Sequence, residues 1–534
     1  DSRPVVQGRP GQRFRQGFFR FRPDGSDLEF IRSTDNNTWG LGITEEGLIL
    51  GSTANHNPSV YMPIPNRYYE KVRGWSPQVL RMISDTHLFM PITDKVRQVD
   101  QFGGYTAGAG HAVYTARQYP KEYWNRTAFV CEPTGHLVGT FVLRRNGADF
   151  SSQNTFNLFA SDDEWSAPIM AEVGPDGNVW VIDWYNYIVQ HNPTPAGFEN
   201  GKGNAYETDL RDKRHGRIYR VIYGESTEPY TLQDASPEKL VATLKHPTQL
   251  WRKHAQRLLV ERGKDDVVPA LIELIQDPSV DEIGLNVGAI HALWTLNGLM
   301  SQAEKTSEWE AATKAIVGAL KHPSAGVRRT ALQTLPQGLK SGASEAIVQL
   351  LEKEEDGQVR LAALLALSEH PSEGKAGPKV AQLIQEGEFL RDKWLADGLT
   401  IAAAVHVEEF LPALAQQGPQ QRDERRASPR AAQLVETIAE HFARGKPTSE
   451  QMNKVLSSVV KGDAATVEAF FSGLGKGWPN GHRVELSAET EQALISQLDR
   501  LPTSAKSHAV RLASLWGSKA FDKYTSEIVA SLMA

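Results

Sequence analysis

Hydrophobic and polar positions alternate with a period of two in short runs along the first two-fifths of the chain. The clearest run is Asn178 to Trp184, which follows Val173 and the tetrapeptide Gly174-Pro175-Asp176-Gly177. A period of two predicts a strand, and proline with glycine in four residues is typical of a tight turn. We therefore predict a β-hairpin that carries a polar and aromatic loop after its second strand.

The same plan recurs elsewhere in residues 1–225. The other predicted strand runs are 18–21 with 28–31, 39–43 with 48–51, 129–131 with 137–143, and a closing strand at 216–223. Hairpins that recur with almost no helical period between them predict a partial β-propeller of about two to three blades. Because a closed propeller needs about four or more blades, we expect N-terminal blades outside this chain. A small open β domain is the alternative.

After Glu225 the period of the apolar positions changes from 2 to 3.6. Three segments, LWRKHAQRLL, GVRRTALQTL and QVRLAALLAL, each place an arginine three residues before an alanine; these arginines are Arg252, Arg328 and Arg360. Copies at intervals of about 30–45 residues predict an α-solenoid of HEAT-like repeats. We interpret the arginine as a structural cap or ion-pair partner, and we find no catalytic pattern after Glu225.

These patterns predict a multidomain β plus α protein with four segments. The segments are 1–225, a partial β-propeller; 226–415, a HEAT-like α-solenoid; 416–430, a polar linker; and 431–534, further HEAT-like helices. The length of 534 residues agrees with more than one core. The chain begins at Asp1 without a methionine, and we expect it to be an internal piece of a longer protein.

Composition narrows the classes of partner and cofactor. The net charge of −6 provides no basic footprint, so we expect no nucleic-acid partner. No apolar run approaches the length of about 18 residues that a membrane span needs. The single cysteine, Cys131, excludes an internal disulfide, a CxxC zinc site and an attached c-type haem within the chain. It lies in an apolar strand pattern, which predicts a buried and inert thiol.

Polar side chains at the predicted strand ends are candidates for chemistry, because one end of each innermost propeller strand converges on a central channel. Histidine and aspartate there can act as general base and orienting acid. The predicted catalytic residues are His111, His136, Asp183 and His191. The predicted substrate-binding residues are Asn36, Asn37, His56 and Asn186. Asparagine oxygens also suit Ca²⁺, although no metal-ligand set is assigned. The alternative for the three asparagines is a hydrogen bond to a turn backbone.

Five stretches carry a resemblance to a known group of proteins. They are NNTWGLGITEEGLILGSTANHNPS, GGYTAGAGHAVYTAR, WNRTAFVCEPTGHLVG, VGPDGNVWVIDWYNYIVQHNPTP and GKGNAYETDLRDKRHGRIYRV. Together they resemble large secreted proteins of planctomycetes, verrucomicrobia and relatives that bear the name membrane-bound dehydrogenase. Members of that group join a propeller to HEAT repeats and then to a CxxCH cytochrome c module. The resemblance covers nearly all of residues 14–223.

The propeller of that group is similar to glucose/sorbosone dehydrogenases, which use pyrroloquinoline quinone (PQQ) and Ca²⁺. Their Arg-Asn-Pro segment before a glycine looks like residues 36–40 here, where Asn36 stands in place of the arginine and Thr38 in place of the proline. The catalytic histidine of the family lies in an earlier blade. The resemblance thus implies PQQ and calcium in the intact protein, and haem c only in a C-terminal module outside this chain.

We therefore predict the propeller–HEAT portion of a periplasmic or secreted quinoprotein-type dehydrogenase, inactive alone. The intact protein would oxidise a carbohydrate or small alcohol and pass the electrons to haem. The alternative is a non-catalytic scaffold that binds a glycan on the propeller and a protein partner on the solenoid. The aromatic residues Tyr61, Tyr68, Tyr69 and Trp75 fit glycan stacking equally well.

Overall fold

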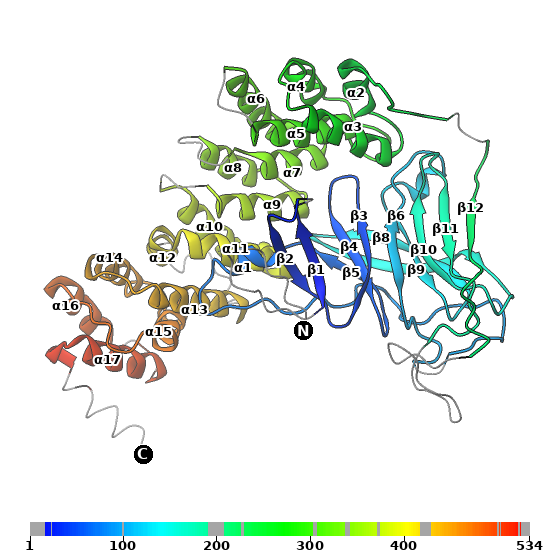
Figure 1. Ribbon diagram of the computed structural model, residues 1–534. Coiled ribbons are helices and arrows are strands. Elements are labelled where there is room, and N and C mark those ends of the chain that lie inside the picture. The colour runs from blue at the N-terminus through cyan, green and yellow to red at the C-terminus, as the bar shows by residue number, and fades with distance from the viewer. Residues whose placement is uncertain are drawn as a thin grey trace. The chain divides into compact units, whose positions relative to one another are not determined.

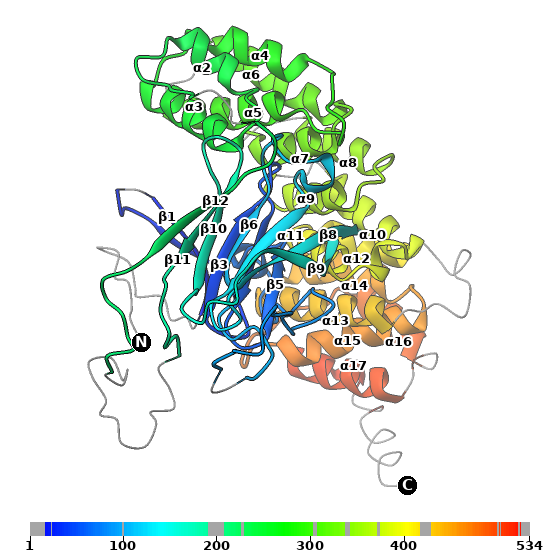
Figure 2. The ribbon, with the colours of Figure 1, turned by 90° about the vertical axis from the view of Figure 1, so that its right-hand side faces the viewer.

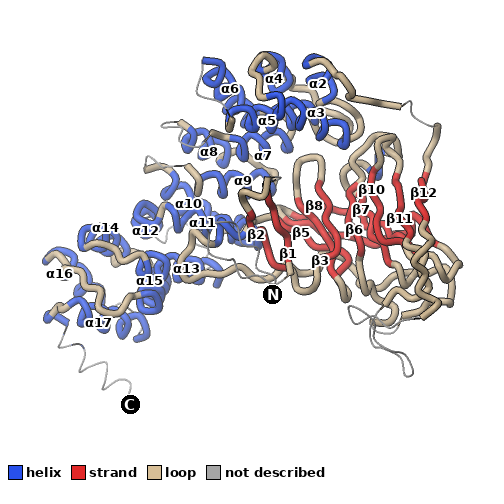
Figure 3. Tube along the Cα trace, viewed as in Figure 1, coloured by secondary structure: helices blue, strands red, loops and turns tan. Residues whose placement is uncertain are grey.

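A computed structural model shows a β region followed by a helical region, as the change of period predicts (Figure 1, Figure 3). It describes residues 16–22, 24–98, 101–190, 208–225, 229–302, 307–336, 342–370, 374–416, 429–498, 501, 503–521 and 524. The predicted linker at 416–430 lies mostly outside these residues, between the end of one helix at Gln416 and the start of the next at Pro429.

The strands all precede residue 222. They are β1 (Gly17–Phe21), β2 (Leu28–Ser33), β3 (Thr38–Ile43), β4 (Ile49–Thr53), β5 (Asn57–Met62), β6 (Ala109–Val113), β7 (Thr127–Glu132), β8 (Leu137–Asn146), β9 (Asp149–Ala160), β10 (Pro168–Val173), β11 (Val179–Asp183) and β12 (Arg217–Val221).

Apart from one short helix, the α-helices follow the strands. They are α1 (Asn66–Tyr69), α2 (Pro237–Thr243), α3 (Gln249–Arg262), α4 (Val268–Gln276), α5 (Val287–Met300), α6 (Ser307–Gly318), α7 (Ala325–Thr334), α8 (Ala343–Leu351), α9 (Gly357–Leu367), α10 (Ala376–Glu386), α11 (Lys393–Val405), α12 (Val407–Gln416), α13 (Pro429–Arg444), α14 (Ser449–Val459), α15 (Ala464–Gly477), α16 (Ala488–Gln497) and α17 (Thr503–Trp516). Short 3-10 helices cover Lys121–Tyr123, Ala319–Lys321, Phe389–Arg391 and Lys519–Phe521.

The chain forms two compact units that do not coincide with the change from strands to helices. Unit 1 consists of residues 1–65 and 78–335, and unit 2 of residues 66–77 and 336–534. Helices α2 to α7 therefore belong to the same unit as the sheets, and α3 and α7 bond to turns that follow strands. No helix among the described residues is both long enough and apolar enough to cross a membrane by itself. The successive helices α11 and α12 pass that test only as a pair, which is bent by 110°.

Four small antiparallel sheets make up the β region of unit 1, in the strand orders β1-β2, β3-β4-β5, β6-β7-β8-β9 and β10-β11-β12. The hairpin predicted around residues 174–177 is confirmed as β10–β11, with Val173 opposite Val179. The amide of Gly177 donates to the carbonyl oxygen of Gly174 at 3.0 Å. Its φ of 76° is a conformation that glycine adopts without strain, so this turn depends on that residue.

Two hydrophobic clusters hold the sheets face to face. One includes Leu50 and Tyr61 of the sheet β3-β4-β5 with Phe141 of β8. The other includes Cys131 of β7 and Val181 of β11. Cys131 is fully buried, as predicted. The first strands of the three larger sheets lie side by side, β3 next to β6 and β6 next to β10. Burial of these clusters against one another is the main stabilising term of the β region.

Glycines permit the close approach of β3 to β6. A Cβ atom at Gly40 would collide with the carbonyl oxygen of Gly110, and one at Gly42 with that of His111. Larger side chains at these two positions would push the strands apart.

Helix α3 lies across the carboxyl ends of β3, β6 and β10 (Figure 2). The amide of Gln249 donates to the carbonyl oxygen of Thr115 at 2.9 Å, and its Nε2 donates to that of Thr44 at 3.1 Å. Trp251 Nε1 donates to the carbonyl oxygen of Pro175 at 2.8 Å. These three carbonyls belong to residues one or two positions after β3, β6 and β10. The three strands therefore all end at α3.

Each recurring arginine donates a hydrogen bond to the backbone carbonyl oxygen of the residue six positions before it. The guanidinium groups of Arg252, Arg328 and Arg360 donate to the carbonyl oxygens of residues 246, 322 and 354 at 2.5, 2.8 and 2.5 Å. The interpretation of these arginines as structural caps is thus confirmed. The alanine three residues later is fully buried in every copy, at positions 255, 331 and 363. A small residue there permits close helix packing.

In unit 2, the segment 66–77 packs among the helices although it follows β5 in the sequence. The Tyr69 hydroxyl donates to Asp397 of α11 at 2.6 Å, and the amide of Arg73 donates to His441 Nδ1 of α13 at 2.9 Å. Tyr68 and Tyr69 are buried there, and Tyr61 is buried in unit 1. The expectation that these tyrosines form a glycan-stacking surface is therefore wrong, because they pack in protein interiors.

Candidate functional site

The predicted site residues gather at the strand ends opposite α3, which we call the distal end. Because β4, β7 and β11 run antiparallel to β3, β6 and β10, they run away from α3. The turn after β4 holds His56, the turn after β7 holds His136, and β11 ends at Asp183. Asn36 and Asn37 lie directly before β3, also at this end. His111 differs, since it lies in the middle of β6.

His136 and Asp183 meet at Ser166. His136 Nδ1 lies 2.5 Å from the carbonyl oxygen of Ser166, and its Nε2 lies 3.2 Å from that of Lys95. Asp183 accepts hydrogen bonds from the Ser166 hydroxyl at 3.1 Å and from the amide of Ala167 at 2.6 Å. Both side chains are buried. A neutral imidazole donates from one nitrogen only, so one of these two contacts is the hydrogen bond. Both contacts hold His136 between neighbouring loops.

His111 is enclosed between the sheets. Its Nε2 lies 2.9 Å from the Ser59 hydroxyl, and its Nδ1 has no hydrogen-bond partner among the described residues. The side chain is fully buried, and this burial lowers the pKa of His111 to about 4. The imidazole is therefore neutral near pH 7 and has no contact with solvent.

Asn36 and Asn186 bond to loop backbone, as the turn alternative describes, whereas the Asn37 side chain has no hydrogen bond among the described residues. Asn36 Oδ1 accepts from the amide of Asn37 at 2.7 Å. Asn186 Nδ2 donates to the carbonyl oxygen of Asp212 at 2.9 Å, and its Oδ1 accepts from the amide of Ile188 at 3.2 Å. These contacts close loops at the distal end.

The remaining two predicted residues are His56 and His191. The ring of His56 lies edge-on to that of His87, with 4.6 Å between the ring centres, and its backbone has a positive φ of 73°. Its Nδ1 atom is buried without a hydrogen-bond partner in the described part of the chain. His191 lies outside the described residues.

The sequence interpretation missed a buried carboxyl at the distal end, Glu132. It accepts hydrogen bonds from the amides of Thr106, Ala107 and Thr134 at 2.9, 3.3 and 3.1 Å, and from the Thr134 hydroxyl at 2.5 Å. Burial raises the pKa of Glu132 to about 7, and these hydrogen bonds oppose that rise. Glu132 is a charged residue at the end of an apolar strand pattern, and this position was the signal that could have predicted a buried carboxyl. It ties the loop before β6 to the turn after β7.

Predicted site residues that the structure describes bond to different partners. Asn36 bonds its neighbour's backbone, and His111 and His136 are buried with their own partners. Within the described residues no group of three or more His, Cys, Asp or Glu side chains could hold a metal ion. We therefore derive no chemical step through a quinone or a metal in this chain.

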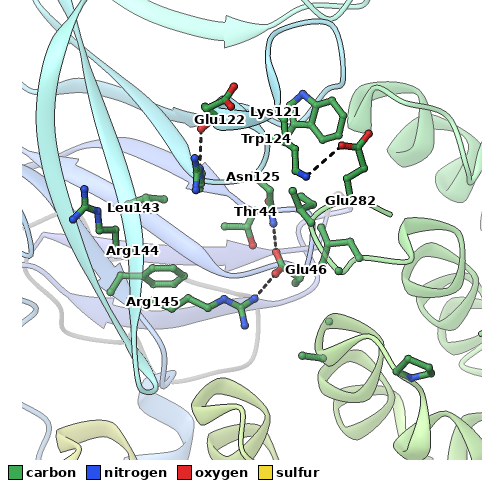
Figure 4. Close-up of a pocket in the computed structure, with 18 residues that line it drawn as sticks. Thr44, Glu46, Lys121, Glu122, Trp124, Asn125, Leu143, Arg144, Arg145 and Glu282 are labelled. Atoms are coloured by element: carbon green, nitrogen blue, oxygen red, sulfur yellow. Dashed lines mark hydrogen bonds and ion pairs between the residues drawn. The ribbon is translucent and has the colours of Figure 1, made fainter. Parts of the chain in front are cut away.

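A cleft of about 700 Å³ lies elsewhere in unit 1, between the sheets and the helices, and we call it the charged cleft (Figure 4). Arg145 pairs with Glu46 at 2.8 Å, and Lys121 pairs with Glu282 at 3.3 Å. Trp124 supplies an aromatic surface on the same wall. Because its walls come from residues 44 to 326, no local pattern could have predicted it.

A buried ion-pair network joins the turn after β3 to α3, next to this cleft. Glu45 and Arg252 form an ion pair and are both fully buried. Arg117 bridges Glu45 and Asp281, with 2.8 Å to each carboxylate. Burial lowers the pKa of Arg252, and Glu45 offsets only part of that effect. Burial also disfavours the charge of Arg117, but the two carboxylates outweigh it and raise the pKa of Arg117.

Comparison with known families gives a match for the β region. Residues 1–225 match a family that is described as a domain of unknown function (DUF7133). No curated protein matches the chain. The matched range ends where the strand pattern gives way to the helical pattern, so the β region is similar to a sequence family that has no assigned activity.

Proposed function

We propose that this chain is the propeller–HEAT portion of a periplasmic or secreted quinoprotein-type dehydrogenase that acts on a sugar or small alcohol. In this proposal the chain supplies scaffold, and the catalytic groups and cofactors belong to other parts of the intact protein. The observation that carries the architecture is the parallel placement of β3, β6 and β10, each the first strand of its sheet. Radial sheets around a channel have this arrangement.

Exposed apolar faces support an incomplete ring. Ile182 and Ile218 are cross-strand neighbours on one face of the sheet β10-β11-β12, with 45% and 68% of their surfaces exposed. On β3, Trp39 is 57% exposed. Large apolar patches mark surfaces that another element covers. In the proposal, further blades cover both flanks.

The helical part fits a HEAT-like solenoid. Its support is the repeated combination of a capping arginine with a fully buried alanine three residues later. Each helix pair then covers the apolar face of the next, as in stacked repeats.

The support for a scaffold role is that the predicted catalytic residues that the structure describes are buried and bonded within the protein. His111 is enclosed, and His136 and Asp183 are both bonded to Ser166. The dehydrogenase activity itself rests on the resemblance of the motifs in residues 14–223. Together these points make the chain inactive alone, with the quinone, calcium and haem held elsewhere in the intact protein.

The test measures dye-linked oxidation of sugars and alcohols with added quinone and Ca²⁺. We expect activity from the intact protein and none from this chain. In the intact protein, His136→Asn and Asp183→Asn should lower the melting temperature and leave the rate of the folded enzyme within about threefold. A loss on the order of 10²-fold or more in a folded variant would instead assign catalysis to these residues. Absence of any oxidation by the loaded intact protein would refute the dehydrogenase.

A second candidate, a glycan-binding scaffold, is favoured by the charged cleft (Figure 4). Arg144 is exposed there and has no hydrogen-bond or ion-pair partner in the described part of the chain. Arg126 is also exposed, and its Nε donates only to the backbone oxygen of Glu122 at 2.8 Å. Two such cations on the walls of a cleft that Trp124 also lines suit an acidic polysaccharide.

Melting temperatures separate the two candidates, because a ligand that binds only the native state raises the melting temperature. An acidic polysaccharide that raises it for this chain, but not for Arg144→Gln, favours the glycan-binding scaffold. The exposed Arg257→Gln on α3 is the matched control. If the polysaccharide leaves the unmodified chain unaffected, the scaffold candidate fails. A rise with quinone and Ca²⁺ on this chain would place the cofactor site here and contradict the scaffold part of the first proposal.

A further inference from the structure

A second cavity of unit 1 lies where β3, β6 and β10 end against α3, and we call it the α3 cavity. Its volume is about 300 Å³. Leu41 and Ile43 of β3, Val173 of β10 and Leu250 of α3 give it aliphatic walls. Two charged side chains also line it, Glu172 from β10 and Lys253 from α3. The cavity thus brings one anion and one cation to an otherwise apolar space.

Glu172 and Lys253 are not paired with each other. Within the residues that the structure describes, neither makes a hydrogen bond or an ion pair through its side chain, although each affects the other electrostatically. The charged cleft differs, because Glu46 and Glu282 are both bonded to cations there. Opposite charges that face one cavity without a direct bond leave room for a ligand between them.

The surroundings dehydrate both charges in part. Both side chains line the cavity and are exposed to solvent. Desolvation raises the pKa of Glu172, and Lys253 opposes that rise. Desolvation likewise lowers the pKa of Lys253, and Glu172 opposes that fall. A bound group of opposite charge at each site would offset the cost of partial dehydration.

These features define the chemistry of a ligand. It must carry a cationic donor for Glu172, an anionic acceptor for Lys253 and an aliphatic body for the walls. None of the described lining residues is aromatic, which disfavours the stacking of a sugar ring. A volume of about 300 Å³ is at the small end of ligand sites. We propose that the α3 cavity binds a small aliphatic zwitterion, of the class of branched neutral amino acids, with its ammonium at Glu172 and its carboxylate at Lys253.

This site is independent of the proposed dehydrogenase. It lies at the α3 end of the strands, whereas the predicted catalytic residues that end strands lie at the distal end. Binding can therefore succeed or fail whatever the oxidation assay shows.

Calorimetric titration of the full chain with three probes tests the inference. L-leucine carries both charges, isocaproate lacks the ammonium and isoamylamine lacks the carboxylate. We expect L-leucine to bind, and each single-charge analogue to bind about tenfold more weakly or worse, because each loses one charge-assisted hydrogen bond. Comparable affinity for all three probes, or no detectable binding of L-leucine at millimolar concentration, would overturn the proposal.

Two variants then assign each charge. Glu172→Gln should weaken L-leucine about tenfold and leave isocaproate unchanged, whereas Lys253→Gln should weaken L-leucine and leave isoamylamine unchanged. Glu273→Gln and Lys264→Gln change exposed residues outside the cavity and are the matched controls. Affinity for L-leucine that neither cavity variant alters would refute the assignment. If a variant does not fold, the three-probe comparison on the unmodified chain still decides.

Discussion

Glu45→Gln should weaken the attachment of α3 to the sheets of unit 1 more than any other single charge removal at this junction. The change keeps the shape of the side chain and removes its charge. Arg252 then remains fully buried with no carboxylate, and keeps the carbonyl oxygen of His246 as its acceptor. Arg117 still has Asp281 at 2.8 Å, so only one of the two arginines loses its counter-ion.

An unpaired buried charge typically costs about 3–5 kcal/mol of folding free energy. Because Arg117 stays paired, we expect about 3 kcal/mol, at the lower end of that range. Arg252→Met should cost less, because Glu45 keeps its bond to Arg117. Arg328→Met is the matched control, since this arginine makes the same backbone cap but is only half-buried; its loss should cost about 1 kcal/mol.

Hydrogen–deuterium exchange of the α3 amides measures these effects locally. About 3 kcal/mol corresponds to about two decades in the opening equilibrium, so exchange in α3 should accelerate about 100-fold in Glu45→Gln. The double variant Glu45→Gln with Arg252→Met should cost less than the sum of the single variants, because it removes both buried charges. Additive costs, or equal effects of Glu45→Gln and of the Arg328 control, would refute the reasoning.

Three further predictions concern the interior of unit 1. Burial lowers the pKa of His111 to about 4 in the folded state, against 6.5 in the unfolded state. The unfolded state therefore takes up the proton first, and the melting temperature should fall as the pH drops from 6.5 to 4. The same dependence of melting temperature on pH in His111→Asn would contradict this. Burial raises the pKa of the Cys131 thiol, which should react with a thiol reagent only after unfolding; rapid labelling of the native protein would contradict its burial. Gly42→Ala should destabilise unit 1 by about 1–3 kcal/mol, because a Cβ atom there overpacks the contact of β3 with β6. Gly318→Ala in α6 has open space around it and should stabilise unit 1 by up to about 1 kcal/mol. Equal changes in the urea midpoint of unfolding for the two variants would exclude this account.

Local structure could be predicted from the sequence because its causes are local. The period of two and the turn at Gly177 predict β10–β11, and the run at residues 39–43 predicts β3, which the structure places at Thr38–Ile43. The arginine caps were also predictable, since the arginine and its acceptor are six residues apart. Side-chain alternation and backbone sterics act over a few residues, so they leave a visible pattern.

The candidate site was predictable only in part. Strand direction places the turns of His56 and His136 and the end of β11 at one end, as the prediction required. The sequence could not show that His136 and Asp183 would both bond Ser166, or that Tyr68 and Tyr69 would be buried in unit 2. Such partners depend on which distant segments pack together.

By itself, the sequence therefore determined the change from strands to helices, the turn of β10–β11 and the capping arginines, whereas β5, β6 and β9 were not predicted. Only the tertiary structure decided the two cavities, the Glu45–Arg252 pair and the pairing state of Glu172 and Lys253. The physical reason is distance along the chain. Residues 45 and 252 meet only after sheets and helices have packed, and that packing is the sum of many weak contacts without a local sequence pattern.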